Sequence, residues 1–317
     1  MAETKLDTHG RRRALASSRG SLLSALALAL AVAGGLTAAV AAQGAVTPAR
    51  WIVFAATPPG TPVNQLFRIQ SSGKGLRQIT TGKLASIAPA FSPDGKRIAF
   101  ARGGAGIFSI NADGTGLRRL TTNDRDSYPT WSPDGKQIAF VRLNKLEWNV
   151  SVMSSTGAGQ RRLVKAPPSG RPTWLASGLL TASGGDLLQI DATTGHVKKY
   201  FGAEIDAIWG MNTVAVSPDG STMTYVGSRS SDPGDLDCGE GPCQRYALYI
   251  EDLLKSKTPR RLAPDVGPAA FSPDGRSLAY VAQGGLVIRA LAGGASKPLA
   301  IGKAYPSVGA PPAWQPR

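Results

Sequence analysis

The chain has 317 residues, of which 42% are hydrophobic and 18% charged. It is therefore apolar enough to bury a core, and an intrinsically disordered chain is excluded. The two cysteines exclude a disulfide-rich scaffold, and the formal net charge of +15 requires an anionic partner or a structural use for the basic surplus.

Residues 1–47 have the features of a leader that precedes the folded domain. An apolar run of Ala and Leu covers residues 22–40, and small residues follow it as a cleavage signature. Four arginines stand before the run: Arg11, Arg12, Arg13 and Arg19. This order predicts a secretory signal peptide. The run is also long enough, at about 19 residues, to span a bilayer as an uncleaved signal-anchor helix. Both alternatives predict an exported protein, either periplasmic or secreted, or anchored by residues 22–42.

From residue 48 onward the chain repeats one motif, an apolar or aromatic anchor that is followed at four places by Ser-Pro-Asp-Gly. Two further tryptophans, Trp174 and Trp314, continue the period without this tetrapeptide, so six anchors occur at spacings of about 40 to 55 residues, which is the period of propeller blades. They are Phe91, Trp131, Trp174, Val216, Phe271 and Trp314. Each anchor ends a first strand. The motif then turns the chain, because proline presets φ and glycine accepts the left-handed conformation.

The segments after each turn predict three further strands. The second strands alternate large and small apolar residues, as a sheet packed between neighbours requires. They cover residues 98–100, 138–140, 179–180, 223–225 and 278–280. The third strands cover residues 107–110, 150–153, 187–190, 246–250 and 286–288. Polar turns then lead to short fourth strands such as residues 118–121.

The two ends of this region supply complementary parts of one blade. Residues 51–54 read as a second strand without a first, and residues 312–315 read as a first strand without its followers. Pairing them would close a ring and remove an open sheet edge. We therefore predict an all-β, six-bladed β-propeller over residues 48–317, closed by pairing of the C-terminal strand with the N-terminal blade.

The repeated motif identifies a family resemblance. Pro-x-Trp/Phe-Ser-Pro-Asp-Gly-Lys/Arg-x-Ile/Leu-Ala-Phe/Tyr resembles the WD40-like repeat of TolB-type propellers, over essentially the whole chain after the leader. The resemblance implies the propeller fold and a protein-binding module of the cell envelope. TolB itself carries an additional N-terminal α/β domain for which this chain has no room, so a Tol-system role is not expected.

The basic surplus gathers on the fourth strands, which form the outer edges of the blades. The residues are Arg77, Arg118, Arg119, Arg161, Arg162, Lys198, Lys199, Arg260, Arg261 and Lys297. Charged side chains on edge strands prevent association between sheets. The alternative is that this basic rim adheres to an anionic envelope polymer or to lipid head groups. Nucleic acid is not expected as a partner, because no aromatic platform lies among the basic pairs.

The sequence predicts no catalytic centre. After the leader the only histidine is His196, in a turn, where a solvated side chain is expected and not the base of a triad. Small residues, Ala or Thr, stand next to each anchor on the innermost strands. No spacing of His, Cys and carboxylates indicates a metal, and no cofactor is expected. We predict a non-catalytic protein, with a lyase or hydrolase that acts on glycan or peptide as the alternative.

Candidate binding residues lie in the loops that enter the innermost strands, since propellers place binding in loops at one face of a rigid ring. They are Arg125, Asp126, Ser127, Arg171, Trp209, Asn212 and Asp265. A protein partner in the envelope and a monomeric state are expected.

An insert at residues 228–245 lengthens the fifth blade. It carries the carboxylates of Asp232, Asp235, Asp237 and Glu240 beside Cys238 and Cys243. In an oxidising compartment such a cysteine pair is expected to close a small disulfide loop. We interpret the insert either as a partner-binding projection or as a variable surface loop, and its carboxylate spacing matches no calcium loop.

Overall fold

All regular structure in the described residues is β-strand, as the sequence predicts. The structure is a computed structural model that describes residues 50–145, 147–165, 171–183, 186–202, 214–227, 247–254, 259–282, 285–307 and 309–316. The predicted leader, Trp209, Asn212 and the insert with both cysteines lie outside these residues.

Five blades are antiparallel four-stranded sheets, each continuous in sequence. Blade 2 contains β4 (Ser86–Phe91), β5 (Arg97–Arg102), β6 (Gly106–Asn111) and β7 (Arg118–Arg119). Blade 3 contains β8 (Asp126–Trp131), β9 (Gln137–Asn144), β10 (Glu147–Ser154) and β11 (Arg161–Lys165). Blade 4 contains β12 (Thr173–Leu175), β13 (Gly178–Ser183), β14 (Asp186–Ile190) and β15 (Val197–Gly202). Blade 5 contains β16 (Ala215–Val216), β17 (Thr222–Gly227), β18 (Ala247–Asp252) and β19 (Arg260–Pro264). Blade 6 contains β20 (Ala269–Phe271), β21 (Ser277–Ala282), β22 (Gly285–Ala290) and β23 (Lys297–Leu299).

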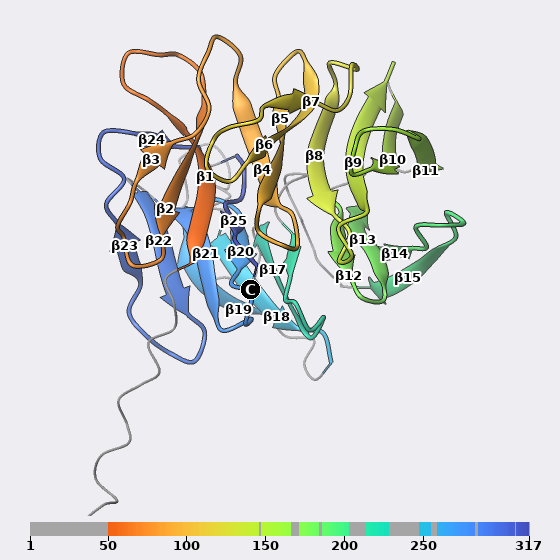
Figure 1. Cartoon of the computed structure of the whole chain (residues 1–317). Helices are drawn as coiled ribbons and strands as arrows, with labels where there is room; N and C mark the ends of the chain where they lie inside the picture. Colours follow the sequence, from red (N-terminus) through yellow and green to blue (C-terminus); the bar gives the residue numbers. More distant parts are fainter. Residues whose placement is uncertain are drawn as a thin grey trace, which may run out of the picture. The chain divides into compact units, whose positions relative to one another are not determined.

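Blade 1 is assembled from segments that lie far apart in the sequence. It contains β1 (Trp51–Thr57), β2 (Gln65–Gln70), β3 (Arg77–Gln78), β24 (Tyr305–Pro306) and β25 (Ala313–Trp314). Both β24 and β25 pair antiparallel with β1, where Ile52 faces Trp314 and Ala56 faces Pro306. The sequence predicts one innermost strand here, over residues 312–315, whereas the structure has two short ones. Figure 1 shows β25 beside β1 and β20.

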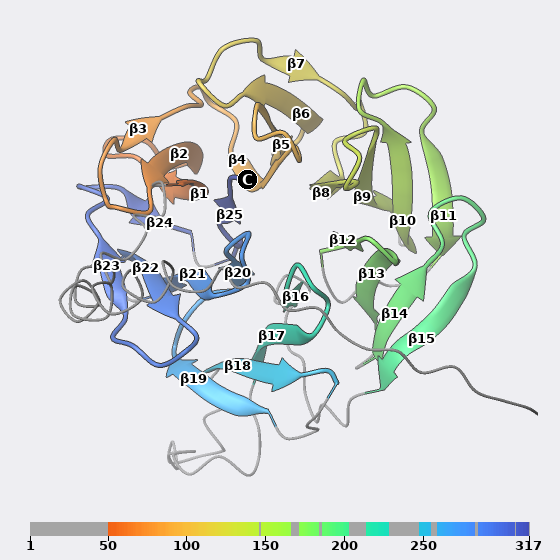
Figure 2. The same cartoon turned by 60° about the horizontal axis from the view of Figure 1, so that its bottom comes forward.

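The six sheets of the described chain form a ring (Figure 2). The strands β4, β8, β12, β16, β20 and β25 surround its axis. The strands β3, β7, β11, β15, β19 and β23 lie on its circumference. In each blade the loop that enters the innermost strand and the turn between the second and third strands therefore lie on the same face of the ring. We call this the loop face. The Ser-Pro-Asp-Gly turns lie on the opposite face.

The hydrophobic core lies between neighbouring blades. In the core between blades 2 and 3, Ile107 and Leu120 pack with Trp131 and Phe140. The second strands are apolar on both sides because each is covered by two blades, and Phe140 is fully buried. The alternating small residues allow neighbouring blades to approach closely, which is why these strands alternate large and small.

The Ser-Pro-Asp-Gly turns repeat one hydrogen-bond pattern. In the first of them the Ser92 hydroxyl donates to the Asp94 carboxylate at 2.6 Å, and Arg97 N donates to Ser92 Oγ at 2.9 Å. Gly95 takes a positive φ of 68°, which L side chains rarely adopt. The bond from the serine lowers the pKa of the Asp94 carboxyl, and the turns at Ser132, Ser217 and Ser272 repeat the pattern. These turns fix the direction in which each second strand leaves the ring axis.

Candidate functional site

Two neighbouring innermost strands bulge at the same place. The ladder register shifts between residues 87 and 90 of β4 and between residues 127 and 130 of β8. Ala88 and Tyr128 have φ values of 52° and 53°, which are uncommon for residues with a Cβ. A proline without an N–H follows each of them. Two residues of each strand are therefore left without a ladder partner at the loop-face end of the ring.

Arg171 occupies the corresponding place in blade 4, directly before a proline and three residues before the anchor Trp174. Its Nη2 donates to the carbonyl oxygens of Pro89 at 3.1 Å and Pro129 at 3.5 Å, which belong to the two bulges. The residue keeps intermediate exposure, but protein surrounds the guanidinium, and this burial lowers the pKa of Arg171 to about 10. Arg171 therefore stays charged at neutral pH and connects the innermost strands of three blades.

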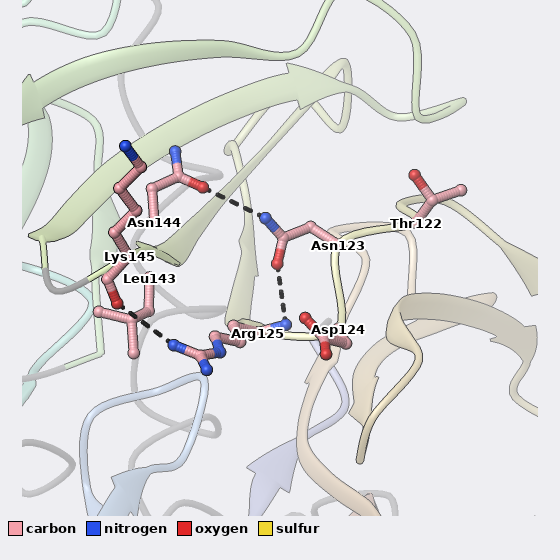
Figure 3. Close-up of a pocket in the computed structure, with 7 residues that line it drawn as sticks. All are labelled: Thr122, Asn123, Asp124, Arg125, Leu143, Asn144 and Lys145. Atoms are coloured by element: carbon pink, nitrogen blue, oxygen red, sulfur yellow. Dashed lines mark hydrogen bonds between the residues drawn. The ribbon is translucent and has the colours of Figure 1, made fainter.

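An open hollow of ≈ 650 Å³ lies on the loop face of blade 3, between the loop that enters β8 and the turn from β9 to β10 (Figure 3). Its lining is mainly polar and consists of Thr122, Asn123, Asp124, Arg125, Leu143, Asn144 and Lys145. Two cations, two amides and one carboxylate therefore surround a space that is open to solvent.

Hydrogen bonds fix the two walls of the hollow against each other. Arg125 Nη1 donates to the Lys145 carbonyl oxygen at 3.2 Å, and Asn123 Nδ2 donates to Asn144 Oδ1 at 3.3 Å (Figure 3). Asn123 Oδ1 accepts a bond from Arg125 N at 2.9 Å. Lys145 has a positive φ of 54°, which closes the turn between two long strands. The hollow is thus formed before any ligand arrives.

Asp126 has a structural partner. Its carboxylate is fully buried and accepts bonds of 2.6 Å from both Nε and Nη2 of Arg142, the residue opposite it in the β8–β9 ladder. The hydrogen bond to Asp126 raises the pKa of the Arg142 guanidinium. Arg142 Nη2 also donates to Gln160 Oε1 at 2.8 Å. A bidentate pair of this kind fixes the start of β8 beside the hollow.

The structure brings some of the predicted binding residues together and separates others. Arg125, Asp126 and Ser127 are consecutive at the start of β8, and Arg171 reaches the same strand through Pro129. Asp265 is exposed before β20 in blade 6, with a φ of 49°. The candidate site therefore consists of the loop-face ends of blades 2, 3 and 4.

Sequence reasoning missed two features of this site. Tyr128 lies close enough to Arg171 to influence its pKa, and Lys145 forms one wall of the hollow. Tyr128 could have been found, because it stands three residues before its anchor Trp131, as Arg171 stands three residues before Trp174. The convergence of two proline carbonyls on Arg171 has no sequence signal, since it depends on the angle between blades.

The basic rim combines exposure with contacts between blades. Arg118 Nη2 donates to Thr156 O at 3.2 Å, in the third-to-fourth-strand turn of the next blade. Lys297 Nζ makes the same kind of bond to Ser72 O at 3.4 Å across the junction of blades 6 and 1. Part of the basic surplus thus connects neighbouring blades. Adhesion of the rim to an anionic surface stays a prediction.

His196 is exposed in the turn between β14 and β15, where its backbone N–H donates to Thr194 Oγ1 at 3.2 Å. In the described ranges no three side chains of His, Cys, Asp or Glu gather as a metal site. Among those same ranges, no helix is long and apolar enough to cross a membrane.

Comparisons with known proteins agree with this architecture. Residues 49–182 match the TolB beta propeller domain. The fold is similar to TolB from Acinetobacter baumannii, at 19% identity and a TM-score of 0.63, over 84% of this chain and 67% of that one. It is also similar to a putative TolB from Agrobacterium tumefaciens, at 14% identity and a TM-score of 0.57, over 84% of this chain and 94% of that one.

A third similar structure comes from a nidogen/laminin complex, at 11% identity and a TM-score of 0.58, over 84% of this chain and 98% of that one. No curated protein sequence matches the chain. Sequence motif and architecture agree that the described chain is a six-bladed β-propeller, and residues 49–182 resemble the TolB beta propeller domain.

Proposed function

We propose that this chain is an exported propeller that binds another protein in the cell envelope and performs no chemistry itself. The observation that carries the proposal is the preformed polar hollow on the loop face of blade 3. Small-molecule sites are usually enclosed and mostly apolar. A wide hollow lined by Arg, Lys and Asn side chains suits the polar surface of a partner protein.

Export rests on the leader. We infer that residues 1–47 direct the chain out of the cytoplasm, as a cleaved signal peptide or as a signal anchor, and that residues 48–317 fold after transport. The exported compartment would also oxidise Cys238 and Cys243 to the predicted disulfide.

We further infer that pairing of β25 with β1 closes the ring and is needed for a rigid loop face. The bonds on both sides of this junction support the inference. Trp314 Nε1 donates to Ala270 O at 3.1 Å in blade 6, and Gln315 Nε2 donates to Gly95 O at 3.1 Å in blade 2. The last described residues thus contact the blades on both sides of blade 1.

Crosslinking in intact envelopes tests the protein-binding function. A photoreactive residue placed at Asn123 or Lys145 should capture one defined protein, identified by mass spectrometry. The same residue at Lys136, in a turn of the same blade on the opposite face, should not. The double variant Arg125→Glu/Lys145→Glu should lower recovery, whereas Lys136→Glu makes the same kind of charge change and should leave it intact.

Equal capture from both faces, or none from either, would contradict the proposal. Deletion of residues 230–243 tests whether the partner binds the hollow on the loop face or the predicted insert. If this deletion alone abolishes capture while the double variant does not, the partner binds the insert and the hollow is not its site.

A further inference from the structure

Arg171 is a buried cation held by neutral groups. The acceptors of its Nη2, the carbonyl oxygens of Pro89 and Pro129, carry only partial negative charge. Within the described residues no carboxylate contacts Arg171. Buried charges in proteins are normally paired, because an isolated charge is costly to remove from water. The site therefore has a positive charge that its own acceptors leave uncompensated.

The Arg171 guanidinium has N–H donors beyond those that bind the two carbonyl oxygens. Of its five N–H groups, those on Nη2 serve the two carbonyls. The groups on Nε and Nη1 donate to no acceptor in the described part of the chain. Arg171 keeps intermediate exposure as a residue although protein surrounds its guanidinium, so part of its side chain borders solvent. A ligand that binds here would meet a cation whose orientation is already fixed, which lowers the entropic cost of binding.

The charge and position of Arg171 indicate what it could bind. A single positive charge is matched by a monoanion, and the two nearby carbonyl oxygens would repel a second negative charge of a phosphate. A carboxylate accepts hydrogen bonds from a guanidinium in its own plane. Arg125 and Lys145 lie on the same face and add positive charge along the approach.

We propose that Arg171 is an anion receptor that binds a carboxylate of an extended peptide segment of the partner, supplied by an Asp or Glu side chain or by the C-terminus. This inference rests on the proposed protein-binding function and specifies its chemistry. The bulges of β4 and β8 have a defined role in it, because they bring two carbonyl groups to one guanidinium and hold it in one orientation.

Peptide binding tests the proposal. Twelve-residue peptides selected from a random library on the full-length protein would be resynthesised as matched sets, with Asp against Asn, Glu against Gln, and a free against an amidated C-terminus. Fluorescence anisotropy should show about tenfold tighter binding of one acid form than of its amide, as expected for a charge-assisted hydrogen bond. Arg171→Gln should abolish this preference, and Arg171→Lys should keep part of it.

The matched control is Arg289→Gln. Arg289 Nη1 also donates to a backbone carbonyl of a neighbouring blade, that of Leu262, so its loss weakens the ring in a similar way without touching the proposed receptor. This variant should keep the acid preference. If Arg171→Gln does not fold, a titration of the wild-type protein still tests the proposal. The ¹⁵N resonance of Arg171 Nε should shift and saturate with sodium acetate but not with sodium chloride, and an unchanged resonance would overturn the proposal.

The other outcomes are distinguishable. Peptides that bind equally well as acid and amide would overturn the receptor while leaving the protein-binding function in place. Absence of any bound peptide, together with absence of a crosslinked partner, would overturn both. Binding of oligouronates in place of peptides, lost in Arg171→Gln, would overturn the peptide as the source of the carboxylate.

Discussion

At the scale of single residues, the aspartates of the Ser-Pro-Asp-Gly turns connect the repeat to stability. Asp94, Asp134, Asp219 and Asp274 each accept a bond from the serine two residues earlier, and this bond lowers the pKa of each carboxyl from its ordinary 3.8. Folding therefore favours the ionised form. The repeated motif sets the turn geometry, and the lowered pKa values lead us to expect a propeller that acid destabilises.

The sign of this linkage gives a prediction. Above the ordinary pKa both folded and unfolded chains are ionised, and the stabilisation is complete. As the pH falls below about 4 the unfolded chain binds protons first, so stability decreases until the lower, folded pKa is passed. The melting temperature should therefore fall steeply below about pH 4, and Asp94→Asn/Asp274→Asn should make that fall shallower in scanning calorimetry.

Asparagine keeps an acceptor oxygen but cannot titrate, so this pair of substitutions isolates the protonation. Asp124→Asn/Asp265→Asn, at exposed loop positions outside the turns, is the control and should retain the wild-type acid profile. If the melting temperature of the turn variant fell with pH as steeply as that of the wild type, the acid effect would come from groups outside these turns.

At the scale of elements, neighbouring blades approach each other at the turns between third and fourth strands. Gly157, between β10 and β11, has a φ of 90°, and a Cβ there would lie 2.6 Å from Leu120 O in blade 2. Trp131 joins the same two blades on the inner side, where its Nε1 donates to Ala90 O at 3.2 Å. Contacts between blades thus occur both at the outer strands and at the innermost strands of the sheets.

Two glycines of this turn allow the stability cost of backbone strain to be measured apart from that of a steric clash. Gly159 also has a positive φ, of 63°, but no atom lies within 4 Å of a Cβ placed there. Gly159→Ala should cost about 1–2 kcal/mol, the price of a left-handed L residue. Gly157→Ala should cost about 2–5 kcal/mol, because a backbone clash is added. Chemical denaturation measures both values, and equal costs would mean that the blades can move apart freely.

At the scale of the whole molecule, blade 1 joins the two ends of the described chain. Its strand β1 pairs with β24 and β25, and Ile52 and Phe54 of β1 pack with Val281 and Leu299 of blade 6. Loss of this junction would destabilise the whole ring, since each sheet needs a neighbour on both sides to bury its apolar faces.

Removal of residues 305–317 tests the junction. The truncation uncovers the edge of β1 and removes the buried Ala313 together with the indole bond of Trp314. The melting temperature should fall by about 10 °C or more, as expected for several kcal/mol in a domain of this size. Removal of Arg317 alone is the control and should change it by about 1 °C or less. A melting temperature that is unchanged by the longer truncation would refute ring closure as a source of stability.

The sequence alone was enough to predict the blades, because the Ser-Pro-Asp-Gly turn and the large–small alternation are local signals whose period defines the architecture. It also indicated Arg125 and Arg171, since both stand in loops that enter innermost strands. It could not show that Asp126 is bound by Arg142, because that pairing follows from the register between β8 and β9.

Tertiary structure decided the remainder. The angle between blades brings the bulges of β4 and β8 to Arg171, and the length of β1 lets it pair with two short strands where the sequence indicated one. Local propensity fixes strands and turns within a few residues, whereas these contacts join residues from different blades. Their geometry exists only once the ring has formed.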